Sequence, residues 1–339
     1  MRKTLYLLLL ALTVSAAASD QAEIDLIATK RLFPEMGPGL VTLKRDAAAR
    51  RYLVLSSRSA GVAVYNTDGQ RIGTIPPSDA SSGAKPAAGA LQFPSDFDIT
   101  SDGRIVIADR AANALRFYDA GGALVQSIST PAPSSVAALP EGEVAVASSA
   151  FASPRDQALR LITVYDKAGR IARTFGDLAE LASRRDLNRF LNIGRVSSDA
   201  SGALYYAFTF LPEPTARKYD RFGYASLELS INSLDIQPAA QAVRREIKRQ
   251  DERGGAAPRM KTIINALGVD PATQEFWLAL GNVVLHLDRE GTQLAAYRAY
   301  SAEGVRLEPV AILVEPDRLL FACDPLGVFA LPRRDKQKP

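Results

Sequence analysis

The feature that most constrains the fold of this chain is a short turn motif that recurs at intervals of about 50 residues. In each copy an alternating apolar segment ends in Tyr or Leu, an acidic or amide residue follows, and Gly comes three positions later. The copies lie at residues 65–69, 118–122, 165–169, 219–223 and 287–291. Gly accepts the positive φ of a tight turn, and the polar side chain accepts hydrogen bonds from the turn backbone. Each copy therefore predicts a hairpin turn between two strands.

A second turn precedes the motif in each repeat, for example at residues 100–103, 140–142, 199–202 and 270–274. Two turns and their flanking strands make four strands per repeat, which is the composition of a propeller blade. The units span residues 39–76, 93–130, 133–176, 191–231, 262–301 and 307–331. The sequence therefore predicts an all-β fold, a six-bladed β-propeller with four-stranded antiparallel blades.

The last unit offers only three evident strands, whereas residues 24–33 alternate like a strand and precede the first complete blade. We expect this N-terminal strand to become the outer strand of the last blade and so to close the ring. Closure of this kind hides the sheet edges that an open array would expose.

The N-terminus has the three parts of a secretory signal peptide. Arg2 and Lys3 precede an apolar segment at residues 5–14, and small residues follow up to Ala18. We expect cleavage after Ala18 and export to the periplasm or the medium. The apolar segment is too short to span a bilayer, and no later stretch reaches the roughly 20 apolar residues that a span needs. The expected organisation is a signal peptide (1–18), one propeller domain (19–334) with a helical insertion (232–261), and a short tail (335–339).

Charge and cysteine content exclude several classes of protein. Of the formal net charge of +4, Arg2 and Lys3 would leave with the signal peptide. The small remaining charge gives no case for a nucleic-acid partner, which would require a clustered basic face. Cys323 is the single cysteine, so no disulfide can form within the chain. We expect it to be a buried, small hydrophobic residue.

One blade resembles a known repeat family. The segments 93–103, 105–109 and 113–118 are similar to an NHL repeat, and Asp109 and Asn113 carry its Asp-then-Asn spacing. The resemblance is partial over the third and fourth units and weak over the fifth and sixth. It implies a six-bladed propeller. It does not imply one function, because this family and its relatives include protein-binding scaffolds, RNA-binding domains and enzymes.

Connection lengths distinguish the two rims of the predicted ring. The turns described above lie on one rim and are short, whereas the long connections fall on the other rim, at residues 77–90, 148–160, 177–189 and 232–261. Function concentrates on loops that a rigid scaffold holds, so we expect the ligand on this long-loop rim and at the tunnel mouth it surrounds. The alternative is that these are neutral insertions, which surfaces tolerate at low cost.

The largest insertion predicts a helix over residues 236–251. One face of it would carry Ile236, Ala240, Val243 and Ile247. We interpret it as a solvated helix that lies across the propeller. A surface for an anionic partner, or a lid hinged at Gly254 and Gly255, is the alternative.

Residues for catalysis are sparse. His286 is the only histidine and lies in an apolar strand, so we expect a buried ring with its hydrogen bonds satisfied. With one histidine and one cysteine, a zinc site of the usual ligands cannot form, and no Gly-x-Ser-x-Gly elbow supports a catalytic triad. Enzymatic activity is therefore left open and is not the favoured interpretation.

Two groups of polar residues are predicted at the tunnel mouth. Asp96, Asn192, Arg195 and Asn265 fall near the starts of inner strands. In lactonase-type six-bladed propellers, acid and amide ligands at such positions hold calcium, and carbonyls or water could complete a set of oxygen ligands. The second group follows the second strand of each blade and comprises Arg58, Arg110, Asn113, Asn282 and Asp324. A polar ring of this kind suits recognition of a protein or envelope ligand, although turn capping explains Asn113 and Asp324 equally well.

The favoured interpretation is an exported binding scaffold that recognises a protein or cell-envelope ligand on the long-loop rim and needs no cofactor. The alternative is a calcium-dependent, lactonase-like hydrolase or lyase at the tunnel mouth.

Overall fold

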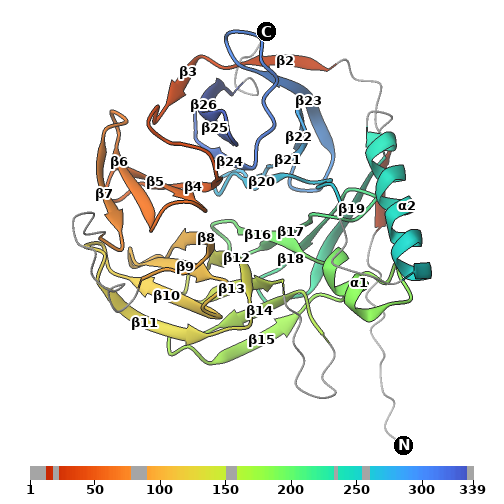
Figure 1. Cartoon of the computed structure of the whole chain (residues 1–339), viewed down its shortest axis with the longest axis horizontal. Helices are drawn as coiled ribbons and strands as arrows, with labels where there is room; N and C mark the ends of the chain where they lie inside the picture. The colour runs from red at the N-terminus through yellow and green to blue at the C-terminus, as the bar shows by residue number, and fades with distance from the viewer. Residues whose placement is uncertain are drawn as a thin grey trace, which may run out of the picture.

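The computed structural model describes residues 13–17, 23–77, 90–149, 159–232, 236–253 and 260–333. Six sheets, each built on four antiparallel strands, surround a common axis as the blades of a propeller (Figure 1). In each blade the strands follow one another from the centre outward, and the inner strands β4, β8, β12, β16, β20 and β24 contact their neighbours around the ring. The predicted fold class is confirmed.

The first three blades are formed by consecutive segments of the chain. Blade 1 consists of β4 (Leu40–Asp46), β5 (Arg51–Ser56), β6 (Val62–Asn66) and β7 (Arg71–Ile75). Blade 2 consists of β8 (Pro94–Ile99), β9 (Ile105–Asp109), β10 (Ala114–Tyr118) and β11 (Leu124–Ser129). Blade 3 consists of β12 (Pro133–Ala138), β13 (Val144–Ser148), β14 (Ile162–Tyr165) and β15 (Ile171–Phe175).

The other three blades recruit strands from the N-terminal segment. Blade 4 consists of β16 (Gly194–Ser198), β17 (Leu204–Phe208), β18 (Thr215–Tyr219) and β19 (Ala225–Asn232), with β1 (Thr13–Ala17) outside β19. Blade 5 consists of β20 (Ala266–Val269), β21 (Phe276–Leu280), β22 (Val283–Leu287) and β23 (Gln293–Tyr300), with β2 (Ile24–Ile27) outside β23. Blade 6 consists of β24 (Ala311–Val314), β25 (Arg318–Cys323), β26 (Gly327–Pro332) and β3 (Lys30–Leu32).

The ring is closed by the N-terminal strand, as predicted, but that strand is shared between two blades. β3 pairs antiparallel with β26, so it is the outer strand of the last blade. β2 pairs parallel with β23 of blade 5. The chain passes from blade 5 to blade 6 between two consecutive residues. The Ala28 amide donates to the Tyr300 carbonyl of blade 5, and the Thr29 amide donates to the Ala330 carbonyl of blade 6, both at 2.8 Å. Residues 24–32, called the strap below, therefore connect blades 5 and 6.

β1 lies in the segment that the sequence predicts to be a signal peptide. It pairs parallel with β19, which is already the fourth strand of blade 4. Loss of β1 would therefore leave a blade with the same number of strands as blades 1 to 3.

The recurring turn motif has the structure that its residues predict. In the copy at residues 219–223, the Asp220 carboxylate accepts hydrogen bonds from the amides of Phe222 and Tyr224, both at 2.9 Å. Gly223 has a φ of +96°, and a Cβ there would lie 2.5 Å from the Phe175 ring of the preceding blade. Gly is thus required both by the turn and by the packing between blades.

The hydrophobic core lies between the faces of adjacent blades. The second strands β5, β9, β17 and β21 are buried along almost their whole length, which explains why they read as continuous apolar segments and not as alternating ones. Trp277 and the aromatic residues of blade 4 are among the largest fully buried side chains. This packing makes the ring a rigid support for its rims.

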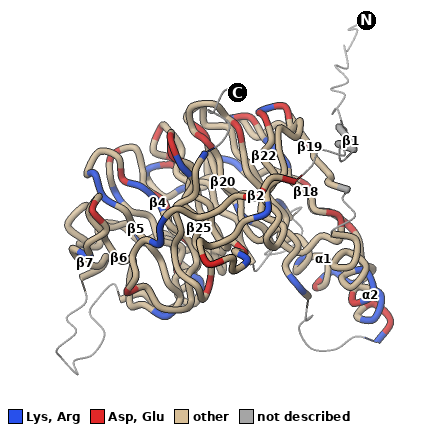
Figure 2. Tube along the Cα trace, turned by 90° about the horizontal axis from the view of Figure 1, so that it is seen from above, with Lys and Arg blue, Asp and Glu red and all other residues tan. Residues whose placement is uncertain are grey.

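Two helices lie together at one side of the ring, α1 (Arg185–Leu191) and α2 (Gln237–Arg253) (Figures 1 and 2). The predicted apolar face of the insertion is buried, since Ala240, Val243 and Ile247 are each less than a tenth exposed. Asp251 of α2 accepts hydrogen bonds from the amides of Ser183 and Arg184, at 2.9 and 3.2 Å, directly before α1 begins. α2 is therefore attached to α1 as well as to the propeller.

Basic and acidic residues are interspersed along the chain and do not gather on one face (Figure 2). Within the described residues, no helix is both long and apolar enough to cross a membrane.

Candidate functional site

The long-loop rim carries a pocket of about 560 Å³ where the insertion meets blade 5. Its polar lining consists of Lys261, Thr262, Asn265, Asn282, Arg298 and Glu308. Its apolar lining includes Ile236 directly before α2, Ala239 in α2, and Leu280 and Val283 at the turn between β21 and β22. We call it the rim pocket. It unites Asn265 and Asn282, one from each of the two predicted groups.

The two asparagines of the rim pocket differ in their hydrogen bonding. The Asn265 side-chain oxygen accepts from the Gly281 amide at 3.1 Å, and the Asn265 backbone amide donates to the Ala279 carbonyl, so Asn265 fixes the turn between β21 and β22. In contrast, Nδ2 of Asn282 is buried and has no hydrogen-bond partner in the described part of the chain. A buried donor without an acceptor costs about 1–3 kcal/mol, and an acceptor that reached Nδ2 would remove this cost.

The charges of the rim pocket are mixed. Arg298 forms an ion pair with Glu23 of the N-terminal segment, and Lys261 and Glu308 are exposed. With amides, both signs of charge and an apolar wall, the pocket can bind a polar group by hydrogen bonds and charge.

A second, smaller cavity of about 80 Å³ lies on the axis of the ring, and we call it the channel cavity. All six inner strands line it. Blades 1 to 4 contribute Thr42, Leu43, Lys44, Asp96, Ser135, Arg195, Val196 and Ser197, and blades 5 and 6 contribute Leu267, Gly268, Val269, Ala311, Ile312, Leu313 and Val314. The cavity is thus polar on one half and apolar on the other.

Asp96 is the centre of a hydrogen-bond chain across the polar half. Its Oδ2 accepts from the Ser135 hydroxyl at 2.6 Å and from the Val136 amide at 3.1 Å, and Ser135 Oγ accepts from the Val196 amide at 3.1 Å. Burial raises the pKa of Asp96, although the charges of Lys44 and Arg195 and the hydrogen bond from Ser135 oppose the shift. Inner strands of blades 2, 3 and 4 are joined in this way.

Two cations complete the polar half. Lys44 Nζ lies 3.2 Å from Asp98 Oδ1, and interaction with Asp98 and Asp96 raises the pKa of Lys44 against the opposing effect of burial. Burial lowers the pKa of Arg195, and the negative charge of Asp96 counteracts this. Lys44, Asp98 and Ser135 were not identified from the sequence. Polar residues at alternate positions of the inner strands were the signal that could have identified them, because such positions share one face.

The predicted calcium ligands are not brought together. Asp96 faces the channel cavity, Asn265 lines the rim pocket, and the Asn192 amide bonds to the backbone of Ala179 and Asn188 at the end of α1. Lys44 and Arg195 beside Asp96 would repel a divalent cation. In the ranges described above, no three His, Cys, Asp or Glu residues gather as a metal site would require.

The remaining predicted residues lie apart from both cavities. Arg58 and Arg110 are exposed on the rim. Asn113 has a φ of 51°, and its side chain accepts from the Ala132 amide at 2.8 Å. Asp324 accepts from the amides of Gly39 and Leu40, so both residues cap the entry of the chain into the next blade. Asn113 and Asp324 therefore have the turn-capping role that was the alternative to a place in a ligand-binding ring.

His286 and Cys323 have the surroundings that their apolar sequence contexts predict. The His286 ring stacks on Trp277 with centroids 4.2 Å apart, and its Nε2 lies 3.0 Å from Glu275 Oε2. The same carboxylate pairs with Arg333 at 3.0 Å. Burial raises the pKa of the Cys323 thiol to about 12, which makes it unreactive.

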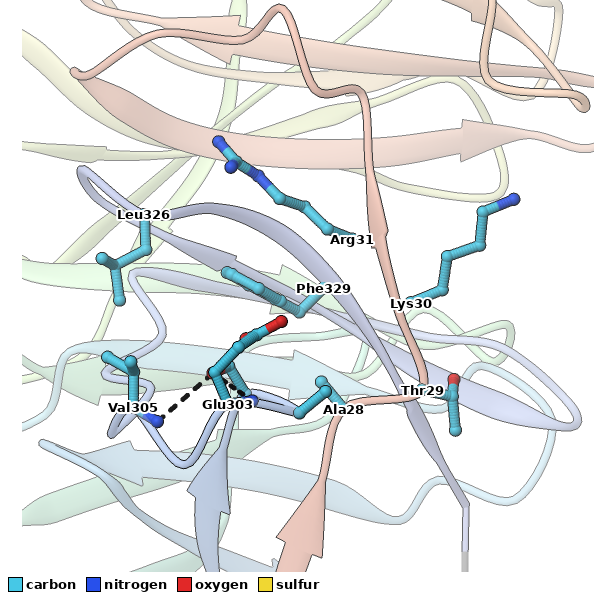
Figure 3. A pocket seen from close by; sticks show the side chains of 10 residues that line it. Ala28, Thr29, Lys30, Arg31, Glu303, Val305, Leu326 and Phe329 are labelled. Atoms are coloured by element: carbon cyan, nitrogen blue, oxygen red, sulfur yellow. Dashed lines mark hydrogen bonds between the residues drawn. The ribbon is translucent and has the colours of Figure 1, made fainter.

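A pocket of about 360 Å³ lies beside the strap and was not predicted, because distant segments of the chain form it. Figure 3 shows Phe329 in its centre, with Arg31 on one side and Glu303 on the other. A hydrogen bond from Ser301 lowers the pKa of Glu303. The lining of this pocket belongs to the strap and to the outer part of blades 5 and 6, and it includes none of the predicted site residues.

No family model matches this chain, and no curated protein matches it. Among solved structures it is similar to virginiamycin B lyase from Staphylococcus aureus, with 12% identity, a TM-score of 0.51, and coverage of 90% of this chain and 98% of that chain. It is similar to U3-55K, with 10% identity, a TM-score of 0.55, and coverage of 89% and 98%. An auxiliary nutrient binding protein from Bacteroides ovatus has 12% identity, a TM-score of 0.55, and coverage of 89% and 71%. At these identities the likeness shows the propeller fold alone.

Proposed function

We propose that this chain is an exported binding scaffold that recognises a protein or cell-envelope ligand at the rim pocket. The observation that supports this most directly is Asn282, which lines a pocket of about 560 Å³ on the rim where the long connections lie and whose buried Nδ2 has no hydrogen-bond partner in the described part of the chain. A preformed concave site with a few convergent polar groups is the usual form of a ligand site. The neighbouring exposed charges of Lys261 and Glu308 suit a polar partner surface.

Export is part of the proposal and is supported by the signal-peptide pattern of residues 1–18. We expect intact-mass measurement and N-terminal sequencing of the secreted protein to give Ser19 as the first residue. Retention of Met1 in protein recovered from the cell interior only would contradict export.

Site-specific photo-crosslinking tests the binding site. A photoreactive amino acid replaces Lys261 at the rim pocket or, as control, Lys167, which is exposed on the short-turn rim. In the cell-envelope fraction, we expect a discrete crosslinked species for position 261 and none for position 167. Excess unlabelled wild-type protein should compete for this species. The Asn282→Leu variant should compete at least roughly tenfold less well, because it loses the free donor and blocks the pocket.

Equal crosslinking at both positions, or equal competition by Asn282→Leu, would contradict recognition at the rim pocket.

Elemental mass spectrometry of the dialysed protein tests the calcium-dependent hydrolase. About one equivalent of calcium per chain that is lost in Asp96→Ala would favour that alternative over the scaffold.

A further inference from the structure

The channel cavity is lined by a cation, Arg195, that interacts with Asp96 through its charge but has no direct hydrogen bond or ion pair within the described residues. A guanidinium has five N–H donors, and a charge in such a confined position is costly unless a partner pairs with it. The partly buried Arg195 is therefore prepared for an acceptor from outside the chain.

The acidic groups nearby are already engaged. Asp96 Oδ2 accepts from Ser135 and Val136, and Asp98 accepts from the Ala138 amide at 2.9 Å and pairs with Lys44. The Lys44 ammonium has three N–H groups, and its contact with Asp98 leaves others to donate. Two cations with unused donors thus line the same cavity.

Among the described residues, the opposite half of the cavity has no polar side chain. β20 and β24 contribute only aliphatic residues and Gly268 to the lining. A ligand that fills the cavity must therefore present an acceptor with negative charge to blades 1 to 4 and an apolar surface to blades 5 and 6.

We propose that the channel cavity binds a short-chain carboxylate, with its head group on Arg195 and Lys44 and its alkyl part against β20 and β24. The planar fork of a guanidinium matches the two oxygens of a carboxylate. A cavity of about 80 Å³ has room for a few water-sized groups and favours acids the size of acetate or butyrate. The carboxylate is either a free acid or the terminus of a chain that enters from the rim. This site is separate from the rim pocket.

Titration calorimetry and thermal unfolding of the exported protein, which is expected to begin at Ser19, test the proposal. The protein is prepared without carboxylate buffers and is titrated with formate, acetate, butyrate, hexanoate or chloride at constant ionic strength. We expect saturable binding of acetate and butyrate, with a matching rise in Tm, and no such effect of chloride, and hexanoate should bind only if the site takes the terminus of a chain that extends to the rim. Arg195→Met should weaken binding by at least roughly tenfold, since it removes a charged hydrogen bond. Arg110→Met, the same change at an exposed position, should bind like the wild type.

Two further variants keep the result interpretable. Arg195→Lys retains the positive charge and should bind with intermediate affinity. It therefore tests the site even if Arg195→Met fails to fold. Leu313→Asn places a polar group on the apolar half and should weaken butyrate more than formate. Binding of butyrate but not of N-acetyl-Gly-Ala identifies a free acid, whereas binding of both, each lost in Arg195→Met, identifies a chain terminus.

Either of two outcomes would overturn the proposal. These are an unsaturable rise in Tm that chloride reproduces, or equal affinity of Arg195→Met and Arg110→Met for acetate. The Asn282→Leu variant of the rim pocket should bind acetate normally, so failure of rim recognition and failure of the channel site are distinguishable.

Discussion

Two buried aspartates of this propeller experience opposite electrostatic surroundings. Asp270 is buried, but the Ala272 amide and Arg333 donate to it, and these bonds outweigh burial and lower its pKa. Asp96 also receives hydrogen bonds, yet burial dominates and raises its pKa. The same residue type therefore stabilises the fold in different pH ranges.

Asp270→Asn should remove a source of acid sensitivity. A lowered folded-state pKa contributes stability that is present above the unfolded-state value of about 4 and is lost as the pH falls through the folded-state value. We expect Asp270→Asn to destabilise the protein at pH 7, because the carboxylate that lies 2.6 Å from Arg333 loses its negative charge. The difference from wild type should shrink below about pH 4, by up to about 1.4 kcal/mol per pH unit. Urea unfolding across this range is the measurement, and a constant difference would contradict it.

Asp96→Asn should have the opposite pH profile. A raised folded-state pKa contributes stability that is present below about pH 4 and is lost as the pH rises through the folded-state value. Wild type should therefore lose free energy of unfolding relative to Asp96→Asn as the pH rises from about 4, by up to about 1.4 kcal/mol per pH unit. The same urea series measures this difference. If the two curves run parallel, the Asp96 carboxylate is ionised as easily in the fold as in the unfolded chain.

At the scale of elements, the turn motif and the alternation of residues 24–33 were sufficient to predict the blades and the ring closure. The division of the N-terminal strand between β2 and β3 could not be predicted, because its partners Tyr300 and Ala330 are far away in sequence. The candidate site was only partly predicted, because it too depends on contacts between residues that are far apart in sequence. Asp96, Arg195 and Lys44 come from three different blades and line one cavity only because the ring is closed. Asn192 lies instead at the end of the short helix α1, which was not predicted, and its side chain bonds to the Ala179 backbone.

The strap offers a matched pair of substitutions. Leu26 is 1% exposed and packs in the core of blades 5 and 6, whereas its neighbour Ile27 is 50% exposed on the other face of β2. We expect Leu26→Ala to lower the free energy of unfolding by about 2–5 kcal/mol, as for other buried leucines. Ile27→Ala should cost less than about 0.5 kcal/mol. Chemical denaturation measures both, and similar losses would mean that β2 is not held against blade 5.

At the scale of the whole molecule, the ring joins unlike halves around one axis. Blades 2 to 4 are connected at the centre by the chain from Asp96 through Ser135 to β16, and blades 5 and 6 are connected at the outside by the strap. The apolar inner strands of blades 5 and 6 provide no polar side chains for such a central chain. The strap therefore supplies at the periphery the inter-blade hydrogen bonds that the centre lacks there.

Removal of N-terminal segments should separate closure of the ring from processing. A chain that begins at residue 19 loses β1 but keeps β19 as the outer strand of blade 4, so its Tm should lie within a few degrees of that of the full chain. A chain that begins at residue 34 also loses β2, β3 and the buried Phe33, which uncovers the edges of β23 and β26. Its Tm should fall by roughly 5–10 °C or more, and it should aggregate, since exposed strand edges pair between molecules. Calorimetry and light scattering of the two chains distinguish these effects. Equal Tm values of the two chains would mean that the blades hold the ring together without the strap. A large fall in the Tm of the chain that begins at residue 19 would mean that β1 is a structural strand of the mature fold.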